Sequence, residues 1–372
     1  MTMRLRHPDG STVHLAYCTN VHPAEDLPGI HGQLSGIAAR VRRLLGTECL
    51  GLGLWLSRHA AGDLLARPGE LAGLRERLAA LGMEVVTLNG FPYRGFHDEI
   101  VKYRVYSPDW VDAERLRHTL GLAEILAALL PDDVTEGTIS TLPLAWRTGW
   151  TAEKAAAVAA NLDAAARGLR ELAERTGKTI RLGFEPEPGC VVETTPQAAR
   201  LLAGADRDHL GVCLDACHLA VGFEEAAAVA GLGLPVVKLQ ASCALEAPPG
   251  TQDALKAFDE PRFLHQTRSQ SGFTDDLGEA LAGGLPTGER WRVHFHVPLH
   301  AAPPPPLTTT APHLRELLNA LLGGPAPLTR HIEVETYTWN VLPGAPPDLA
   351  EGIAAELDWT RRQLAALGLK EL

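Results

Sequence analysis

The feature that most constrains the fold is a short segment in which apolar and charged residues alternate. Between residues 181 and 187, Leu182 and Phe184 alternate with Glu185 and Glu187. Successive side chains of a β-strand point to opposite faces, so one face of this segment is apolar and the other is charged. Burying a pair of carboxylates is costly unless a cation or a proton compensates them. We therefore expect this strand to end beside water, a cation or a metal ion.

The same one-sided alternation recurs in later segments of the chain. Their polar faces carry, in chain order, Asp215, Lys238 with Gln240, His294 with His296, and Glu333 with Glu335. In a doubly wound sheet helices cover both faces, which makes both faces apolar. One apolar and one polar face instead predict an α/β fold of the TIM (β/α)8 type, with helices outside and a polar cavity at the C-terminal ends of the strands.

The order of segments fits this barrel, but it includes one more candidate strand than the ring needs. Nine candidate strands are separated by amphipathic helical patterns, so we expect either 236–242 or 293–298 to lie outside the ring. Stretches rich in Pro and Gly predict insertions around 243–290 and 300–312, within a single domain that spans 1–372. The clearest helix covers 151–178, where Thr151 can cap the start and Gly177 can adopt the left-handed conformation at the end.

Composition narrows the class of protein. The formal net charge is -11 and no run of Lys or Arg stands out, which argues against a nucleic-acid partner. The N-terminus lacks an apolar signal core, and no stretch approaches the roughly 20 apolar residues of a membrane span, so we expect a cytoplasmic protein. Six cysteines would stay reduced there, and the close pair Cys213 and Cys217 lacks the second pair that a structural zinc site would need.

Four polar side chains would meet at the mouth of the barrel, because each lies at the C-terminal end of a different strand. They are Glu185, Asp215, one of His294 and His296, and Glu335. Three carboxylates and one imidazole suit a divalent ion such as Mn2+, Mg2+, Co2+ or Zn2+, with open positions for the oxygen atoms of a substrate. Each residue alone is more often solvated or salt-bridged, but the joint pattern predicts one divalent metal ion.

A strand-end Glu, the segment "LDACH" with Asp and His three apart, a His-bearing strand and a final "IEVET" occur in this order. The order resembles the xylose isomerase-like TIM barrels, the sugar isomerase/epimerase superfamily. The resemblance implies that a Glu, Asp, His, Glu set binds one divalent metal. It assigns Glu185 and Glu335 as ligands and catalytic bases, Asp215 as a ligand, His296 as the imidazole ligand and His218 as a substrate contact.

A narrower resemblance rests on "AYCTNVHPAE", "TLNGFPYRGFH", "VYSPDW", "STLPLAW", "LDACH" and "HIEVETYTWNVLP". Together these motifs resemble the EboE family of metabolite traffic proteins. The resemblance implies a role in the biosynthesis or traffic of a secondary metabolite. It also implies an operon that encodes a membrane prenyltransferase-like protein, which this chain could contact.

Two loops contain further candidates for substrate binding. In "LNGFPYRGFH", Asn89 and His97 could bind the hydroxyl groups of a substrate between the aromatic residues at 91, 93 and 96. Equally, these aromatic residues could cover the edge of the barrel beside a turn. In "AYCTNVHP", Asn20 and His22 could face the cavity, but we interpret them as turn residues.

Other polar residues near the mouth are also candidate substrate contacts, namely Gln240, His294, Glu187 and Lys238. A desolvated lysine can form a Schiff base, as in class I aldolases, but a salt bridge to a neighbouring carboxylate is the simpler interpretation of Lys238. Glu187 and Glu333 could instead support the metal ligands from behind.

The sequence thus favours a metal-dependent isomerase or epimerase that acts on a polyhydroxylated or hydroxy-carbonyl small molecule. The alternative is a barrel that binds and carries a metabolite without converting it. A metal-dependent nuclease of the same fold is disfavoured, because no basic surface for DNA is evident in the sequence.

Overall fold

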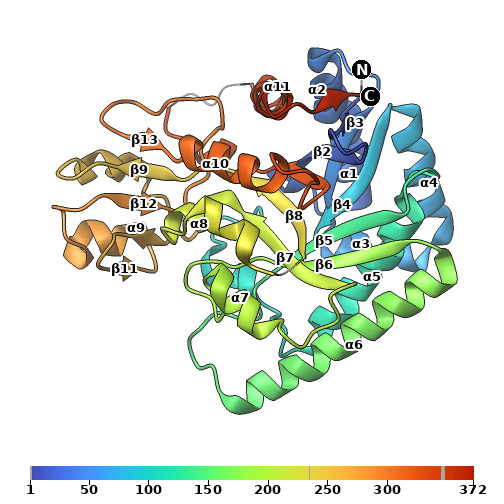
Figure 1. Ribbon diagram of the computed structural model, residues 1–372, viewed down its shortest axis with the longest axis horizontal. Helices are drawn as coiled ribbons and strands as arrows, with labels where there is room; N and C mark the ends of the chain where they lie inside the picture. The colour runs from blue at the N-terminus through green and yellow to red at the C-terminus, as the bar shows by residue number, and fades with distance from the viewer. Residues whose placement is uncertain (1, 234, 345–347) are drawn as a thin grey trace.

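The computed structural model describes residues 2–233, 235–344 and 348–372. Its centre is a closed ring of parallel strands (Figure 1). In ring order these are β2 (Thr12–Cys18), β3 (Leu50–Trp55), β4 (Met83–Asn89), β5 (Glu136–Thr141), β6 (Thr179–Phe184), β7 (Leu210–Asp215), β8 (Val236–Ala241) and β14 (His331–Val334). The ring closes because β14 pairs with both β8 and β2. The expected TIM (β/α)8 barrel is confirmed.

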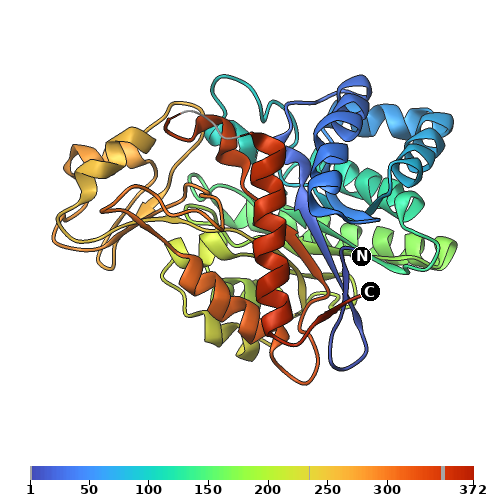
Figure 2. The same ribbon diagram turned by 90° about the horizontal axis from the view of Figure 1, so that it is seen from above.

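Helices surround the ring, as the apolar outer face of the strands requires. They are α1 (Leu27–Gln33), α2 (Ala39–Leu45), α3 (Arg58–Ala66), α4 (Pro68–Ala80), α5 (Ala113–Leu129), α6 (Ala152–Thr176), α7 (Thr195–Leu201), α8 (Ala216–Val221), α10 (Ala311–Leu322) and α11 (Leu349–Ala366). Figure 2 shows α11 running between α10 and α2. Within the described ranges, no helix has the length and apolar character needed to cross a membrane.

The longest helix ends as its sequence predicts. The side chain of Thr151 accepts a hydrogen bond from the backbone N–H of Lys154 at the start of α6, and Gly177 ends the helix with a φ of 69°. A left-handed φ of this kind costs glycine little, since it has no Cβ.

Between β8 and α10 the chain forms a second, smaller sheet beside the barrel (Figure 1). Its strands, in the order in which they pair, are β11 (Phe273–Thr274), β10 (Thr267–Arg268), β12 (Trp291–Val293), β9 (Leu245–Ala247) and β13 (Thr308–Thr309). The short helix α9 (Leu277–Glu279) belongs to the same segment. Of the two strand candidates left open by the sequence, 236–242 forms β8 of the barrel, whereas 293–298 begins at the end of β12 and lies outside the ring.

The two ends of the chain lie next to each other (Figure 1). The strand β1 (Arg4–Arg6) pairs antiparallel with β2 on one side and with β15 (Lys370–Glu371) on the other. These two strands therefore extend the sheet outside the ring without entering it.

An ion pair occupies the interior of the barrel. Lys238 on β8 pairs with Glu333 on β14, and both side chains are fully buried. The Nζ atom of Lys238 also donates to the Ser140 hydroxyl at 3.2 Å. Gly53 on β3 leaves the necessary room, because a Cβ at this position would lie 1.3 Å from Oε1 of Glu333. Lys238 is thus a salt-bridge partner, but of Glu333 rather than of the carboxylates at the mouth.

Breaking this pair on one side should destabilise the fold strongly. Glu333→Gln leaves the ammonium group of Lys238 buried without a counter-charge, which should lower the free energy of unfolding by about 3–5 kcal/mol. The double variant Lys238→Met/Glu333→Leu removes both charges and should recover most of that loss. Guanidinium unfolding followed by circular dichroism would measure both effects. A Glu333→Gln variant as stable as wild type would contradict the pairing.

Candidate functional site

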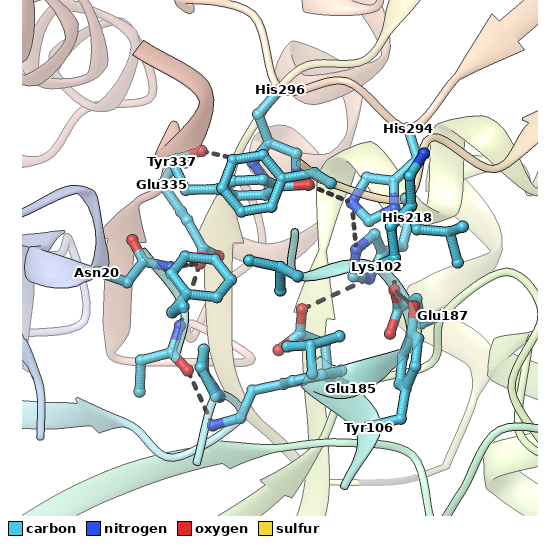
Figure 3. Close-up of a pocket in the computed structure, with 18 residues that line it drawn as sticks. Asn20, Lys102, Tyr106, Glu185, Glu187, His218, His294, His296, Glu335 and Tyr337 are labelled. Carbon is cyan, nitrogen blue, oxygen red and sulfur yellow. Dashed lines mark hydrogen bonds and ion pairs between the residues drawn. The ribbon is translucent and has the colours of Figure 1, made fainter. Parts of the chain in front are cut away.

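A small cavity opens at the C-terminal ends of the barrel strands, with a volume of about 60 Å³ (Figure 3). Barrel strand ends and loops of the second sheet both contribute to its walls. Among the residues expected from the sequence, those that line it are Asn89, Glu185, Glu187, His218, His294, His296 and Glu335. The remaining expected residues lie beside or beneath the cavity, namely Asp215, Gln240, Lys238 and His97.

Three acidic side chains converge at the base of the cavity. Glu185 directly follows β6, Asp215 ends β7, and Glu335 directly follows β14. One carboxylate oxygen of each lies within 4.8 Å of the others. Burial and the mutual repulsion of these carboxylates raise the pKa of Glu185 and of Glu335 well above the usual range. The arrangement would therefore bind either a proton or a cation tightly.

Asp215 is held in place from one side only. Its Oδ1 accepts hydrogen bonds from the Ser242 hydroxyl at 2.7 Å and from the backbone N–H of His218 at 3.0 Å. Its Oδ2 is buried and has no hydrogen-bond partner. Burial alone would raise the pKa of Asp215, but His218, His296 and the Ser242 hydrogen bond together lower it. Asp215 thus keeps one oxygen that accepts no hydrogen bond.

Glu335 is held by three amide groups. Its Oε1 accepts from Nδ2 of Asn20 at 2.6 Å and from Nδ2 of Asn89 at 3.0 Å, and its Oε2 accepts from the Gln240 amide. Gln240 therefore acts as a support for Glu335 and does not line the cavity. Asn20 belongs to the 3-10 turn Thr19–Val21, as interpreted, and its side chain also points into the mouth (Figure 3).

Three imidazoles form the opposite side of the site. His218 lies on α8, whereas His294 and His296 lie on the loop that follows β12. The ring of His296 bonds through Nδ1 to the backbone carbonyl of Glu335 at 2.8 Å, and its Nε2 has no hydrogen-bond partner, 3.8 Å from Oδ2 of Asp215. His294 faces the cavity as well, so the sequence alternatives are not exclusive. Burial lowers the pKa of all three imidazoles.

Glu187 lies at the edge of the same cluster. Its Oε1 accepts hydrogen bonds from the hydroxyl of Tyr106 at 2.7 Å and from Nε2 of Gln266 at 3.1 Å. Burial raises the pKa of Glu187 to about 7. Together with His218 and His294 it forms a second set whose candidate ligand atoms lie within 4.8 Å of one another.

His97 stands apart from this cluster. Its ring packs on Trp55 with centroids 5.6 Å apart, and its Nε2 has no hydrogen-bond partner. Burial lowers its pKa to about 4. The aromatic residue Phe96 packs against the same ring at 5.7 Å. Phe96 lines the cavity, whereas His97 is not among the lining residues, so the expected substrate contact of His97 stays a prediction.

Several cavity residues were missed in the sequence. Lys102, Tyr106, Phe263 and Tyr337 lie on irregular or 3-10 segments, where strand alternation gives no information about direction. Tyr106 belongs to the quoted motif "VYSPDW", which carried a family resemblance but no assigned role. Lys102, a cation at the cavity, is paired with Asp276 of the second sheet segment.

Comparison with known proteins identifies the fold family. A family model described as xylose isomerase-like TIM barrel matches residues 43–251. No curated protein matches the chain.

Solved structures resemble the whole chain at low sequence identity. A probable 3-DHS dehydratase involved in petrobactin synthesis from Bacillus anthracis shares 14% identity at a TM-score of 0.51, covering 93% of this chain and 98% of that one. A xylose isomerase domain protein from Alicyclobacillus acidocaldarius shares 13% at 0.51, covering 95% and 99%. A D-tagatose 3-epimerase-like protein shares 12% at 0.52, covering 95% and 98%. At these identities the likeness shows the fold alone.

One buried carboxylate anchors two walls of the site from behind. Glu356 on α11 accepts hydrogen bonds from the backbone N–H of Leu299 at 3.1 Å and from the hydroxyl of Thr336. It also accepts from Nε1 of Trp339 at 3.1 Å. Leu299 follows the loop of His296, and Thr336 follows Glu335. Burial raises the pKa of Glu356 to about 7, above the ordinary value of 4.5.

This shift predicts a pH dependence of stability. Because the folded state holds the Glu356 proton more tightly than the unfolded chain, the contribution to the free energy of unfolding is present below about pH 4.5 and is lost as pH rises through about 7. Between pH 4.5 and 8, the stability of wild type relative to Glu356→Gln should fall by about 3 kcal/mol. Chemical unfolding of both proteins across this range measures it; a constant difference would contradict the shift.

Proposed function

The chain belongs to the xylose isomerase-like TIM barrel family, and on this premise we propose that it is a metal-dependent isomerase- or epimerase-like enzyme. The proposed substrate is a polyhydroxylated or hydroxy-carbonyl small molecule. The proposal assigns Glu185, Asp215, His296 and Glu335 as the ligands of one divalent ion.

The observation that carries this proposal is a set of buried atoms without hydrogen-bond partners. Oε2 of Glu185, Oδ2 of Asp215 and Nε2 of His296 are all buried and unpartnered. Such groups are costly in a folded protein unless something positive meets them. A mixed set of carboxylate and imidazole donors fits Mn2+, Co2+ or Zn2+. An ion bound there would provide Lewis-acid stabilisation of negative charge that develops on the substrate.

The two glutamates differ in how free they are to move a proton. Both oxygens of Glu335 accept hydrogen bonds from amide groups, which fix its orientation. Glu185 keeps one oxygen that accepts no hydrogen bond. A carboxylate oxygen that is free of hydrogen bonds suits a group that takes a proton from carbon and returns it. We therefore assign Glu185 as the proton-transfer group and Glu335 as the fixed partner on the other side.

The walls of the cavity support an uncharged substrate with an apolar side. Phe91, Phe96, Phe263 and Tyr337 line the same cavity as the carboxylates. Lys102, the lysine in the lining, already pairs with Asp276 and so offers little to a phosphate or carboxylate group. A ring that carries hydroxyl groups on one edge and C–H groups on its face matches this environment, because aromatic walls favour apolar surface. Cyclic polyols and their ketones are the substrates of choice for screening.

The narrower EboE-like role extends this proposal. It places the reaction in the biosynthesis or traffic of a secondary metabolite, and it proposes a membrane prenyltransferase-like protein as a partner. The second candidate is a carrier that binds a metabolite and returns it unchanged. Glu335 supports it, because both of its oxygens already accept hydrogen bonds and neither is free to take a proton. Incubation of a bound compound with metal-loaded protein distinguishes the enzyme from the carrier, because only the enzyme would change the compound.

The ligand assignment predicts metal content. Untagged wild type, loaded and then dialysed, should retain an ion at this site. Asp215→Asn and Glu185→Gln should lose it, because each removes a ligand charge. Asp132→Asn, a change at an exposed carboxylate, should retain the wild-type content. Inductively coupled plasma mass spectrometry gives the stoichiometry. Equal content in Asp215→Asn and wild type would contradict the assignment.

The catalytic assignment predicts proton exchange. Epimerisation and dehydration of a hydroxy-carbonyl compound both begin with removal of a proton from the carbon beside the carbonyl. Metal-loaded protein in deuterated water should therefore incorporate deuterium into a substrate, as detected by NMR. Glu185→Gln should slow exchange by about 100-fold or more. A compound that binds and is released with no deuterium, across a panel of cyclic polyol ketones, would favour the carrier.

A further inference from the structure

Two neighbouring imidazoles in the site have the same fixed tautomer. Nδ1 of His218 lies 3.2 Å from the backbone carbonyl of Pro186, and Nδ1 of His294 lies 2.7 Å from the side-chain oxygen of Gln266. A carbonyl oxygen can only accept a hydrogen bond, so Nδ1 carries the hydrogen in both rings. Each neutral ring then keeps the lone pair on Nε2.

The orientation of the Gln266 amide follows from its other partners. Its nitrogen donates to Oε1 of Glu187 at 3.1 Å and to the carbonyl of Pro188 at 3.0 Å, both of which are acceptors. A third contact reaches the hydroxyl of Tyr106 at 2.9 Å. The amide cannot be turned around without facing these acceptors with its own oxygen. The oxygen of Gln266 must therefore face His294.

Consequently, two lone pairs meet head to head. Nε2 of His218 and Nε2 of His294 lie 3.1 Å apart (Figure 3). The hydroxyl of Tyr337 lies 3.4 Å from Nε2 of His294 and does not serve Nε2 of His218. Two acceptors 3.1 Å apart repel unless a positive charge lies between them. If a metal lay about 2.1 Å from each nitrogen, the observed separation would give an angle of about 95° at the metal, which coordination geometry permits. A carbonyl or amide partner on the far nitrogen is also the usual support of a metal-binding imidazole.

Glu187 can provide the third ligand. A carboxylate oxygen of Glu187 and one nitrogen each of His218 and His294 lie within 4.8 Å of one another. Two histidines and one glutamate are a common ligand set of zinc sites that keep an open position. Four carboxylates gather at the mouth, namely Glu185, Glu187, Asp215 and Glu335. The first site as assigned leaves Glu187 without a cation.

We propose that Glu187, His218 and His294 bind a second divalent transition-metal ion, such as Zn2+, next to the first. This site goes beyond the proposed function and does not share its ligand set. Its defining ligand, His294, comes from the segment that forms the second sheet and not from a barrel strand.

Zinc stoichiometry tests the second site directly. Wild type is loaded with Zn2+, dialysed against a weak chelator and analysed for metal per chain. We expect two ions in wild type, one in His294→Gln, one in Glu187→Gln and one in Asp215→Asn. His59→Gln removes an exposed histidine of α3 and should retain two. Circular dichroism and thermal unfolding of each variant confirm that the chain is folded.

Each outcome separates the second site from the first. A single ion in wild type that His294→Gln retains and Asp215→Asn loses would overturn the second site and leave the proposed function standing. A single ion lost in His294→Gln but kept in Asp215→Asn would support the second site and contradict the first. Wild type that stays free of metal would overturn both, with a proton between the two imidazoles as the explanation. If His294→Gln fails to fold, Glu187→Gln provides the same test, because it removes another ligand of the same site.

Discussion

Closure of the barrel turns the polar face of every strand inward, and this constraint governs the rest of the site. A carboxylate inside the ring has no bulk water and needs a donor or a cation. Glu333 has Lys238, and Glu335 has amide groups. Asp215 receives hydrogen bonds at one oxygen only, and Glu185 keeps an oxygen free. The free oxygens of Asp215 and Glu185 therefore lie at the mouth of the barrel, where a cation can bind them.

The sequence predicted the barrel and the three acidic residues of the mouth for the same reason. Alternation along a strand is a local property, and parallel register brings the C-terminal ends of β6, β7 and β14 to one rim. Glu185, Asp215 and Glu335 follow from these two facts. The choice between His294 and His296 could not be made, because both lie on a loop beyond β12, where alternation does not fix the direction of a side chain.

How far along the barrel a side chain lies was harder to predict than which face of the strand carries it. Lys238 and Gln240 share a face, as expected, but two residues correspond to about 7 Å along a strand. That distance places Lys238 beneath the mouth, paired with Glu333, and leaves Gln240 at the level of Glu335. Phe91 and Phe96 were among the candidates, but Tyr106, Phe263 and Tyr337 were missed, because the loops and 3-10 segments that carry them have no periodicity that predicts direction.

The second sheet positions an imidazole at the place in the rim where the end of β8 provides none. The polar face of β8 ends in Gln240 and Ser242, which support Glu335 and Asp215 by hydrogen bonds and provide neither imidazole nor carboxylate. The chain leaves the barrel directly after this strand, and β12 pairs with β9 and β10 before the loop returns to the mouth. His296 then bonds to the carbonyl of Glu335 and places its free nitrogen near Asp215. The second sheet therefore positions the imidazole that would complete the proposed ligand set.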